Sequence, residues 1–190
     1  MTTAHERKKQ PDVVRRRLLD CTARISIERG LASLTIQAVA DAAGVTKGGL
    51  LHHFPSKQHL VEAVFHDLLE TLDADIDAAM ARDPEEHGRF TRAYMTTIFR
   101  PLTCTKNDLW AAISIAMLTE PSLHKSWGEW LKKRLDRHGH TDTDPASEIA
   151  RYAADGVWLA DLMGADGEGP RDREALFSQL AELTRKTKRP

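Results

Sequence analysis

Cysteine is scarce in this 190-residue sequence, and long apolar runs are absent. Its two cysteines, Cys21 and Cys104, do not have the spacing of a disulfide framework, which favours buried thiols in a reducing compartment. No stretch approaches the roughly 18 uninterrupted apolar residues of a membrane helix, and the polar N-terminus has no signal-peptide core. We therefore expect a cytoplasmic protein that has no membrane partner.

Catalytic and metal-binding motifs are also missing. The sequence contains no P-loop, no nucleophile elbow and no paired-cysteine metal spacing, so we expect neither an enzyme nor a cofactor. Residues 138–144 gather four possible metal ligands in a segment without a regular element to fix them. A polar loop is a better interpretation of this segment than a metal site.

Strand signals are few, whereas apolar residues recur at spacings of three and four almost throughout. This pattern predicts an all-α protein of about nine helices. Proline and glycine breakers divide the chain, and we expect helices at 11–29, 36–43, 47–54, 56–81, 85–101, 107–119, 122–138, 146–164 and 171–187.

Charge is unevenly distributed along the chain, although its net value is only −1. Residues 1–59 contain ten Lys or Arg and five Asp or Glu, a net charge of +5, and the remaining residues carry −6. A basic N-terminal part on an acidic body suggests that one end meets a polyanion such as DNA.

The two short helices at 36–43 and 47–54 are predicted to form a helix-turn-helix. Thr35 and Thr46 are suited to cap their N-termini, and Gly44 to provide the turn between them. We expect the two helices to share a core of small and apolar residues: Val39, Ala40, Ala43, Val45 and Leu50.

The second of these helices is the candidate for insertion into the major groove. We expect it to contact DNA through Thr46, Lys47, Gly49, His52 and His53, with Thr35 and Lys57 at helix N-termini and Arg7, Lys8 and Lys9 on a flexible arm meeting phosphates. Glycine costs ~1 kcal/mol in a helix interior, so we hypothesise that Gly48 and Gly49 permit close approach to DNA.

Residues 15–65 resemble the N-terminal signature of the TetR family of transcriptional regulators. The resemblance rests on Ile36–Ala43, Gly44–Gly48, Leu50, His53-Phe54 and Ser56-Lys57. It implies a homodimer with a three-helix DNA-binding head, and it implies the same seven DNA contacts. Two positions depart from the family pattern. Leu51 replaces the usual Tyr, which removes a hydrogen bond from a phenol to a DNA phosphate. Ser26 replaces an aromatic residue, and this change predicts looser packing of the head.

The predicted domains follow from this assignment. Residues 1–10 form a basic arm, residues 11–55 the head, and residues 56–187 a helical ligand-binding and dimerisation body. The helix at 56–81 links the head to the body.

Four tryptophans, at positions 110, 127, 130 and 158, occur after residue 100 in the predicted body. Aromatic residues at helical spacing usually form core, but together these could line an adaptable pocket for a hydrophobic or aromatic effector. The candidate ligand contacts are Tyr94, Phe99, Arg100, Trp110, Met117, His124, Trp127, Trp158 and Asp161.

The last two predicted helices carry apolar and small residues that suit a two-fold four-helix bundle between subunits. The candidate dimer contacts are Ile149, Ala153, Gly156, Val157, Ala160, Leu176, Leu180 and Leu183. Packing within one chain is the alternative for these residues.

These features predict a ligand-responsive regulator, most simply a repressor that a small effector releases from a pseudo-palindromic double-stranded operator. An activator, or a DNA-binding regulator without a ligand, remains as an alternative. A small helical enzyme would leave the N-terminal pattern unexplained.

Overall fold

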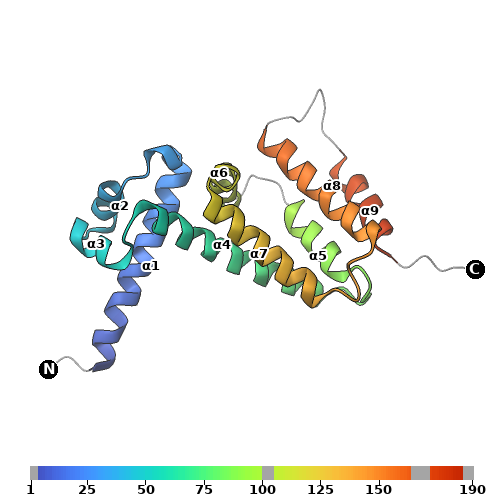
Figure 1. Cartoon of the computed structure of the whole chain (residues 1–190), viewed down its shortest axis with the longest axis horizontal. Coiled ribbons are helices and arrows are strands. Elements are labelled where there is room, and N and C mark those ends of the chain that lie inside the picture. Colours follow the sequence, from blue (N-terminus) through green and yellow to red (C-terminus); the bar gives the residue numbers. More distant parts are fainter. Residues whose placement is uncertain (1–3, 100–104, 164–171, 186–190) are drawn as a thin grey trace, which may run out of the picture. The chain divides into compact units, whose positions relative to one another are not determined.

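A computed structural model describes residues 4–99, 105–163 and 172–185, and its regular elements there are all helical (Figure 1). The nine α-helices of these ranges confirm the all-α prediction. They are α1 (Ala4–Arg29), α2 (Ile36–Ala43), α3 (Lys47–His53), α4 (Lys57–Met80), α5 (Arg89–Ile98), α6 (Thr105–Thr119), α7 (Pro121–Arg137), α8 (Pro145–Leu162) and α9 (Arg173–Leu183), with a 3-10 turn, η1, at Leu31–Ser33.

Helix α1 begins seven residues before the predicted start at Pro11 and continues through that proline. Residues 4–10 are mainly Ala, Glu, Arg, Lys and Gln, which are good helix formers. The segment proposed as a flexible arm is therefore helical from Ala4 onward. None of the helices in the described ranges is long and apolar enough to cross a membrane.

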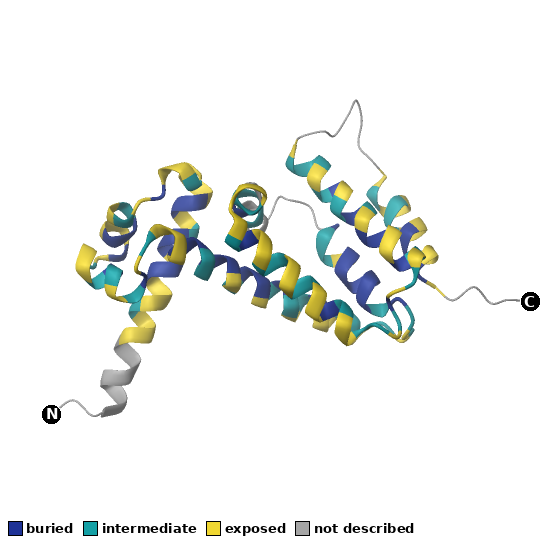
Figure 2. Cartoon of the chain, viewed as in Figure 1, coloured by how far each residue is buried: buried dark blue, intermediate teal, exposed yellow. Residues whose placement is uncertain are grey.

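The chain divides into two compact units, and α4 and α7 each contribute to both. The first unit consists of Met1–Leu68 and Thr103–Lys125, and the second of Leu69–Leu102 and Ser126–Pro190. In the first unit the core residues come from α1 to α4, with Ile113 of α6 and Leu123 of α7, and the buried positions line up on the inner helix faces (Figure 2). Leu18, Val39, Leu50 and Leu60 are fully buried there.

Ser26 of α1, which departs from the family pattern, is buried, and its hydroxyl group has a hydrogen-bond partner. Its hydroxyl donates to the carbonyl of Thr22 at 2.8 Å, and the hydroxyl of Thr22 donates to the carbonyl of Leu18 at 2.8 Å. The helix backbone thus accepts both buried hydroxyl groups, which removes the desolvation penalty of an unpaired polar group.

In the second unit, α8 packs against α5 and α9, and the 138–144 segment has a structural role. Asp142 is fully buried and accepts the backbone N–H of Thr91 at 2.7 Å. Arg151 donates to the Thr91 hydroxyl at 2.7 Å and to the Asp142 carbonyl at 2.9 Å. Asp144 caps α8 by accepting from the backbone N–H groups of its first turn.

A metal site at this segment has no support in the described ranges, where no group of three or more His, Cys, Asp or Glu residues could hold an ion. The acidic residues instead satisfy backbone donors at helix N-termini, as buried carboxylates must. The loop interpretation of residues 138–144 agrees with this arrangement.

Candidate functional site

Helices α2 and α3 form the predicted helix-turn-helix, and each begins at the predicted cap. Thr35 accepts the N–H of Ala38 at 3.1 Å, and Thr46 accepts the N–H of Gly49 at 3.0 Å. Gly44 adopts φ 67° and ψ 35°, the left-handed conformation that glycine enters without steric penalty. The three signals read from the sequence are confirmed.

The shared core of these helices consists of Val39, Ala40, Ala43 and Leu50, all of which are buried, and of half-buried Val45. A backbone bond from the Val45 N–H to the Ala40 carbonyl, at 3.0 Å, closes the turn. Close packing at the two alanines fixes the orientation of α3 on α2.

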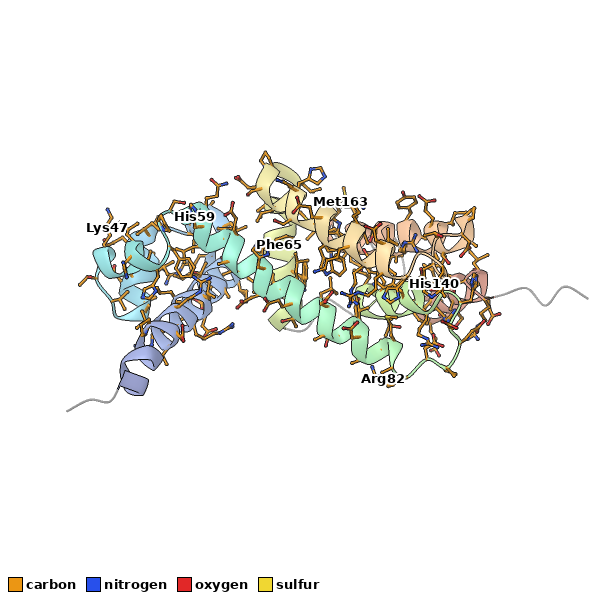
Figure 3. All side chains as sticks on the ribbon, turned by 60° about the horizontal axis from the view of Figure 1, so that its bottom comes forward. Lys47, His59, Phe65, Arg82, His140 and Met163 are labelled. Carbon is orange, nitrogen blue, oxygen red and sulfur yellow. The ribbon has the colours of Figure 1, made fainter. Side chains whose placement is uncertain are left out.

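The opposite face of α3 is open to solvent. Thr46, Lys47 and His52 are exposed, whereas Gly49 and His53 are half-buried. Lys47 points outward from this end of the chain (Figure 3). The His52 and His53 rings meet edge to face, with 5.6 Å between their centroids. The predicted contacts of α3 are therefore all exposed or half-buried.

The two glycines of α3 differ in their surroundings. A Cβ atom added at Gly48 would meet nothing within 4 Å, whereas one at Gly49 would lie 3.2 Å from Oγ1 of Thr46. The protein itself therefore permits a side chain at Gly48, and any steric reason for that glycine lies outside the chain. At Gly49 the capping hydroxyl already restricts the space.

Lys57, at the N-terminus of α4, has a partner that the sequence did not reveal. Its Nζ donates to the carbonyl of Leu31 in η1 at 2.9 Å, although the side chain is exposed. The side chains of Arg7, Lys8 and Lys9 lie outside the described part of the structure. Thr35 is exposed at the start of α2.

Two members of the basic run 15–17 contact the rest of the first unit. The guanidinium of Arg15 lies 4.5 Å from the centre of the Phe54 ring, a cation–π distance. Arg16 forms ion pairs with Asp20, at 2.8 Å, and with Asp67 of α4. These contacts connect α1 to the end of α3 and to α4.

The predicted ligand residues are divided between the two units. In the first, the Trp110 ring lies 6.2 Å from the Phe65 ring, Met117 is half-buried and His124 is exposed. In the second, Phe99 is buried and its ring lies 5.5 Å from that of Phe177. Arg100 lies outside the described residues.

The remaining ligand candidates of the second unit are buried or half-buried. The buried Tyr94 hydroxyl donates to Asp155 at 2.5 Å, and Asp161 accepts Arg173 at 2.8 Å. Trp127 lies 5.0 Å from Trp130, and Trp158 is half-buried. The polar groups of Tyr94 and Asp161 are thus already paired within the protein.

Burial governs the ionisation of the Tyr94–Asp155 pair. Desolvation raises the pKa of Tyr94 well above its ordinary value, and the neighbouring Asp155 carboxylate raises it further. Desolvation also raises the pKa of Asp155, while the hydrogen bond from Tyr94 and the charge of Arg151 oppose that shift. Tyr94 therefore acts as a hydrogen-bond donor in its neutral form.

The predicted dimer residues do not all face the same way. Ile149 and Leu183 are 57% and 50% exposed, and Gly156 is exposed. Val157 and Leu180 are buried, because α8 packs against α5 and α9 within the chain. Ala153, Ala160 and Leu176 are half-buried.

Three exposed apolar residues were not among the predicted dimer contacts: Tyr152 and Leu159 of α8, and Met163 directly after its C-terminus. With Ile149 and Gly156 they follow the spacing i, i+3, i+7, i+10 and i+14, which is a continuous helical stripe. The stripe could have been read from the sequence, but the buried face of the same helix has an equally regular pattern.

Comparisons with known proteins agree with the geometry of both halves. Residues 18–64 match the family described as "Bacterial regulatory proteins, tetR family", and residues 88–185 match "Tetracyclin repressor-like, C-terminal domain". The transcriptional repressor KstR2 of Mycolicibacterium smegmatis is 43% identical over 63 residues, 33% of this chain and 31% of the relative. The match to the KstR2 repressors thus spans less than a third of their length.

Longer matches extend beyond the head. The repressor KstR of Rhodococcus jostii is 28% identical over 152 residues, 78% of this chain and 71% of KstR. The solved structure of the multidrug binding protein EbrR complexed with malachite green has a TM-score of 0.70 at 22% identity, covering 90% of this chain and 98% of EbrR. The structural likeness shows that the two chains share a fold.

Proposed function

Because this chain belongs to the TetR family of transcriptional regulators, we propose that it binds an operator through α3 and that a small effector releases it. The observation that carries this proposal is the capped, tightly packed α2–α3 pair with its open face at Thr46, Lys47 and His52. Such a face fits the major groove, where helix N-terminal residues lie nearest the base edges. A protein with this role acts in the cytoplasm.

The contacts divide by chemistry. Lys47, exposed in the first turn of α3, is the candidate for base edges, and the exposed His52 in the last turn is a further candidate contact. Thr35 and Lys57 start α2 and α4, where backbone N–H groups favour an anion, and they are the candidates for phosphates. Gly48 allows the helix to approach the sugar-phosphate wall, since no atom of the protein fills that space.

A homodimer supplies the second recognition helix. The exposed stripe of α8, from Ile149 through Tyr152, Leu159 and Met163, is the surface that we propose for self-association. Large apolar side chains exposed in a row indicate an interface, and a two-fold axis would make this stripe pack against its own copy. Two copies of α3 about 34–36 Å apart would then read successive major grooves.

The effector is proposed to be small and mainly aromatic or apolar, and the regulator to be a repressor. KstR2 and KstR are named repressors, and EbrR is described in complexes with malachite green and with ethidium. In this chain the aromatic residues of the second unit, including Trp127 and Trp158, are the candidate contacts.

A ligand-independent regulator is the second candidate, and one observation favours it. The polar atoms of Tyr94 and Asp161 are bonded to Asp155 and Arg173, so they are not free to orient a ligand. Effector-sensitive operator binding would distinguish the first candidate from this one.

The test is a salt titration of binding to the DNA that flanks the coding region, with Lys47→Ala beside wild type. Lys133→Ala, an exposed lysine of α7 outside the proposed surface, is the matched control. We expect saturable, salt-sensitive binding that Lys47→Ala weakens and Lys133→Ala leaves unchanged. If both variants weakened DNA binding equally, the effect would follow from net charge alone, and this result would contradict the proposed role of α3.

A further inference from the structure

Leu51 is an apolar residue at the surface of α3 that has no role among the DNA contacts proposed so far. Its side chain is half-buried, whereas Leu50 beside it is fully buried in the core of the first unit. The other residues of α3 that solvent reaches are glycines or carry polar side chains. Leu51 is therefore the single apolar side chain that this helix presents to solvent.

The position of Leu51 around the helix places it beside the proposed DNA-reading residues. Successive residues of an α-helix are about 100° apart, so Leu51 lies between Lys47 and Gly48 on the helix circumference, one turn further along. Lys47 is exposed and points outward, and a Cβ atom at Gly48 would meet nothing within 4 Å (Figure 3). Leu51 thus shares the face that Lys47 and Gly48 form.

Helix α3 is short enough for this face to reach base edges along its whole length. Its seven residues span about 10 Å, and the major groove of B-DNA is about 12 Å wide. Since Gly48 has no side chain, the part of the helix surface next to Leu51 can approach the DNA closely. A side chain in the second half of the helix can therefore contact a base pair.

The chemistry of the major groove limits what a leucine can contact there. Base edges present hydrogen-bond donors and acceptors, and the apolar group among them is the C5-methyl group of thymine. A leucine side chain cannot bond a phosphate, and it would leave a polar base edge unsatisfied if it covered one. Contact with a thymine methyl instead removes apolar surface of both partners from water.

We propose that Leu51 is a specificity-determining residue that contacts the C5-methyl group of one thymine in each half of the operator. The inference rests on the proposed function, because it requires α3 to lie in the major groove. It also gives the departure from the family pattern a consequence for specificity. The missing phenol removes a phosphate contact that carries no sequence information, and the leucine adds a contact that depends on the base.

Replacing thymine with uracil tests the proposal, because deoxyuridine pairs as thymidine does and lacks only the methyl group. Wild type first selects its preferred site from a library of random double-stranded DNA, and each thymine of that site is then replaced in turn. Binding to the labelled duplexes is measured by fluorescence anisotropy at one fixed salt concentration. Burial of one methyl-sized group favours binding about fourfold, so we expect one thymine in each half-site whose replacement weakens binding by that factor, and about 15-fold weakening when both are replaced.

Variants of Leu51 assign the methyl contact. Leu51→Ala should bind the thymine duplex about 15-fold more weakly than wild type and should not distinguish uracil from thymine at the sensitive position. A purely structural role would weaken binding to both duplexes equally and leave the preference intact. Leu51→Met keeps an apolar side chain and should retain the preference, and Leu118→Ala, which shortens an exposed leucine of α6, is the control and should behave as wild type. Alanine and methionine are good helix formers, and circular dichroism checks that each variant is folded.

The possible outcomes separate this proposal from the proposed function. If wild type selects a site but no thymine in it is sensitive to uracil, Leu51 does not read a methyl group and the inference alone fails. A preference for thymine that Leu51→Ala keeps would assign the contact to another residue and would also overturn the inference. If wild type selects no site, the proposed function fails and the inference fails with it. The uracil series with wild type is a test even if Leu51→Ala does not fold.

Discussion

Replacing Gly88 with alanine is the substitution whose cost the structure defines most closely. Gly88 precedes α5 with φ 70°, and its N–H donates to the Thr141 carbonyl at 2.9 Å. An added Cβ would overlap the carbonyl oxygen of Thr184 and lie 2.8 Å from the Thr184 Cβ and 2.9 Å from Nη1 of Arg92. Both backbone conformation and available space therefore oppose a side chain.

The two effects can be estimated separately. The left-handed conformation costs a non-glycine residue about 1–2 kcal/mol, and overpacking a filled site costs about 1–3 kcal/mol. Gly88→Ala should therefore destabilise the protein by about 2–5 kcal/mol, a large share of a typical free energy of unfolding of about 5–15 kcal/mol. Thr184 cannot move away cheaply, because it ends α9 and its hydroxyl accepts the buried Arg92.

Gly44→Ala is the matched control, since Gly44 has φ 67° but nothing within 4 Å of an added Cβ. Its free energy of unfolding should fall by about 1–2 kcal/mol, the cost of the left-handed backbone conformation alone. The assay is urea unfolding followed by circular dichroism at one fixed protein concentration, with each variant compared with wild type. If Gly88→Ala is no less stable than Gly44→Ala, the packing of α9 against Gly88 is not as described.

Five further predictions concern single groups. Gly128→Ala, in the interior of α7 with open space around its Cβ position, should stabilise the protein by about 0.5–1 kcal/mol in the same assay. Thr46→Val should lower the free energy of unfolding by about 1 kcal/mol, because the cap of α3 is lost. Burial raises the pKa of Asp155 above 3.8, so the wild type should lose stability relative to Asp155→Asn as the pH rises through and above about 4. At Asp144 burial opposes but hydrogen bonds from Ser147 prevail and lower the pKa, so the wild type should lose stability relative to Asp144→Asn as the pH falls below about 4. Opposite slopes in pH-dependent denaturation would support both assignments, and equal slopes would contradict one of them. Met163→Glu should shift the mass in solution from dimer to monomer, while Leu118→Glu, an exposed apolar residue of α6, should not.

Features set by a few neighbouring residues could be predicted from the sequence. Thr35, Gly44 and Thr46 act within one helical turn, so residue type and spacing suffice to place the ends of α2 and α3. The predicted start of α1 was wrong. Proline is common at the first position of a helix, which favoured a start at Pro11, but the helix-forming residues before it extend α1 to Ala4.

Features set by distant residues could not be read in this way. Asp142 looks like a loop acid in the sequence, yet it is fully buried because Thr91, 51 residues away, donates to it. Val157 and Gly156 are neighbours on α8, and only the packing of α5 and α9 decides that the first is buried and the second exposed. Leu31, Val61 and Ala116 line one cavity of the first unit although they are far apart in the sequence, so its volume has no local signature.

The order of the proposed DNA-reading surface depends on contacts outside α3. A seven-residue helix is far below the roughly 12–15 residues at which isolated helices become even marginally stable in water. Its geometry is therefore imposed by fully buried Leu50, by the Thr46 cap and by Phe54, which lies beneath the Arg15 guanidinium. Arg15 and Arg16 thus contribute to the head through packing and pairing as well as through charge. The basic character of residues 1–59 consequently overstates the charge that is free to attract DNA, and Lys47 carries a larger share of the proposed interaction than its single charge suggests.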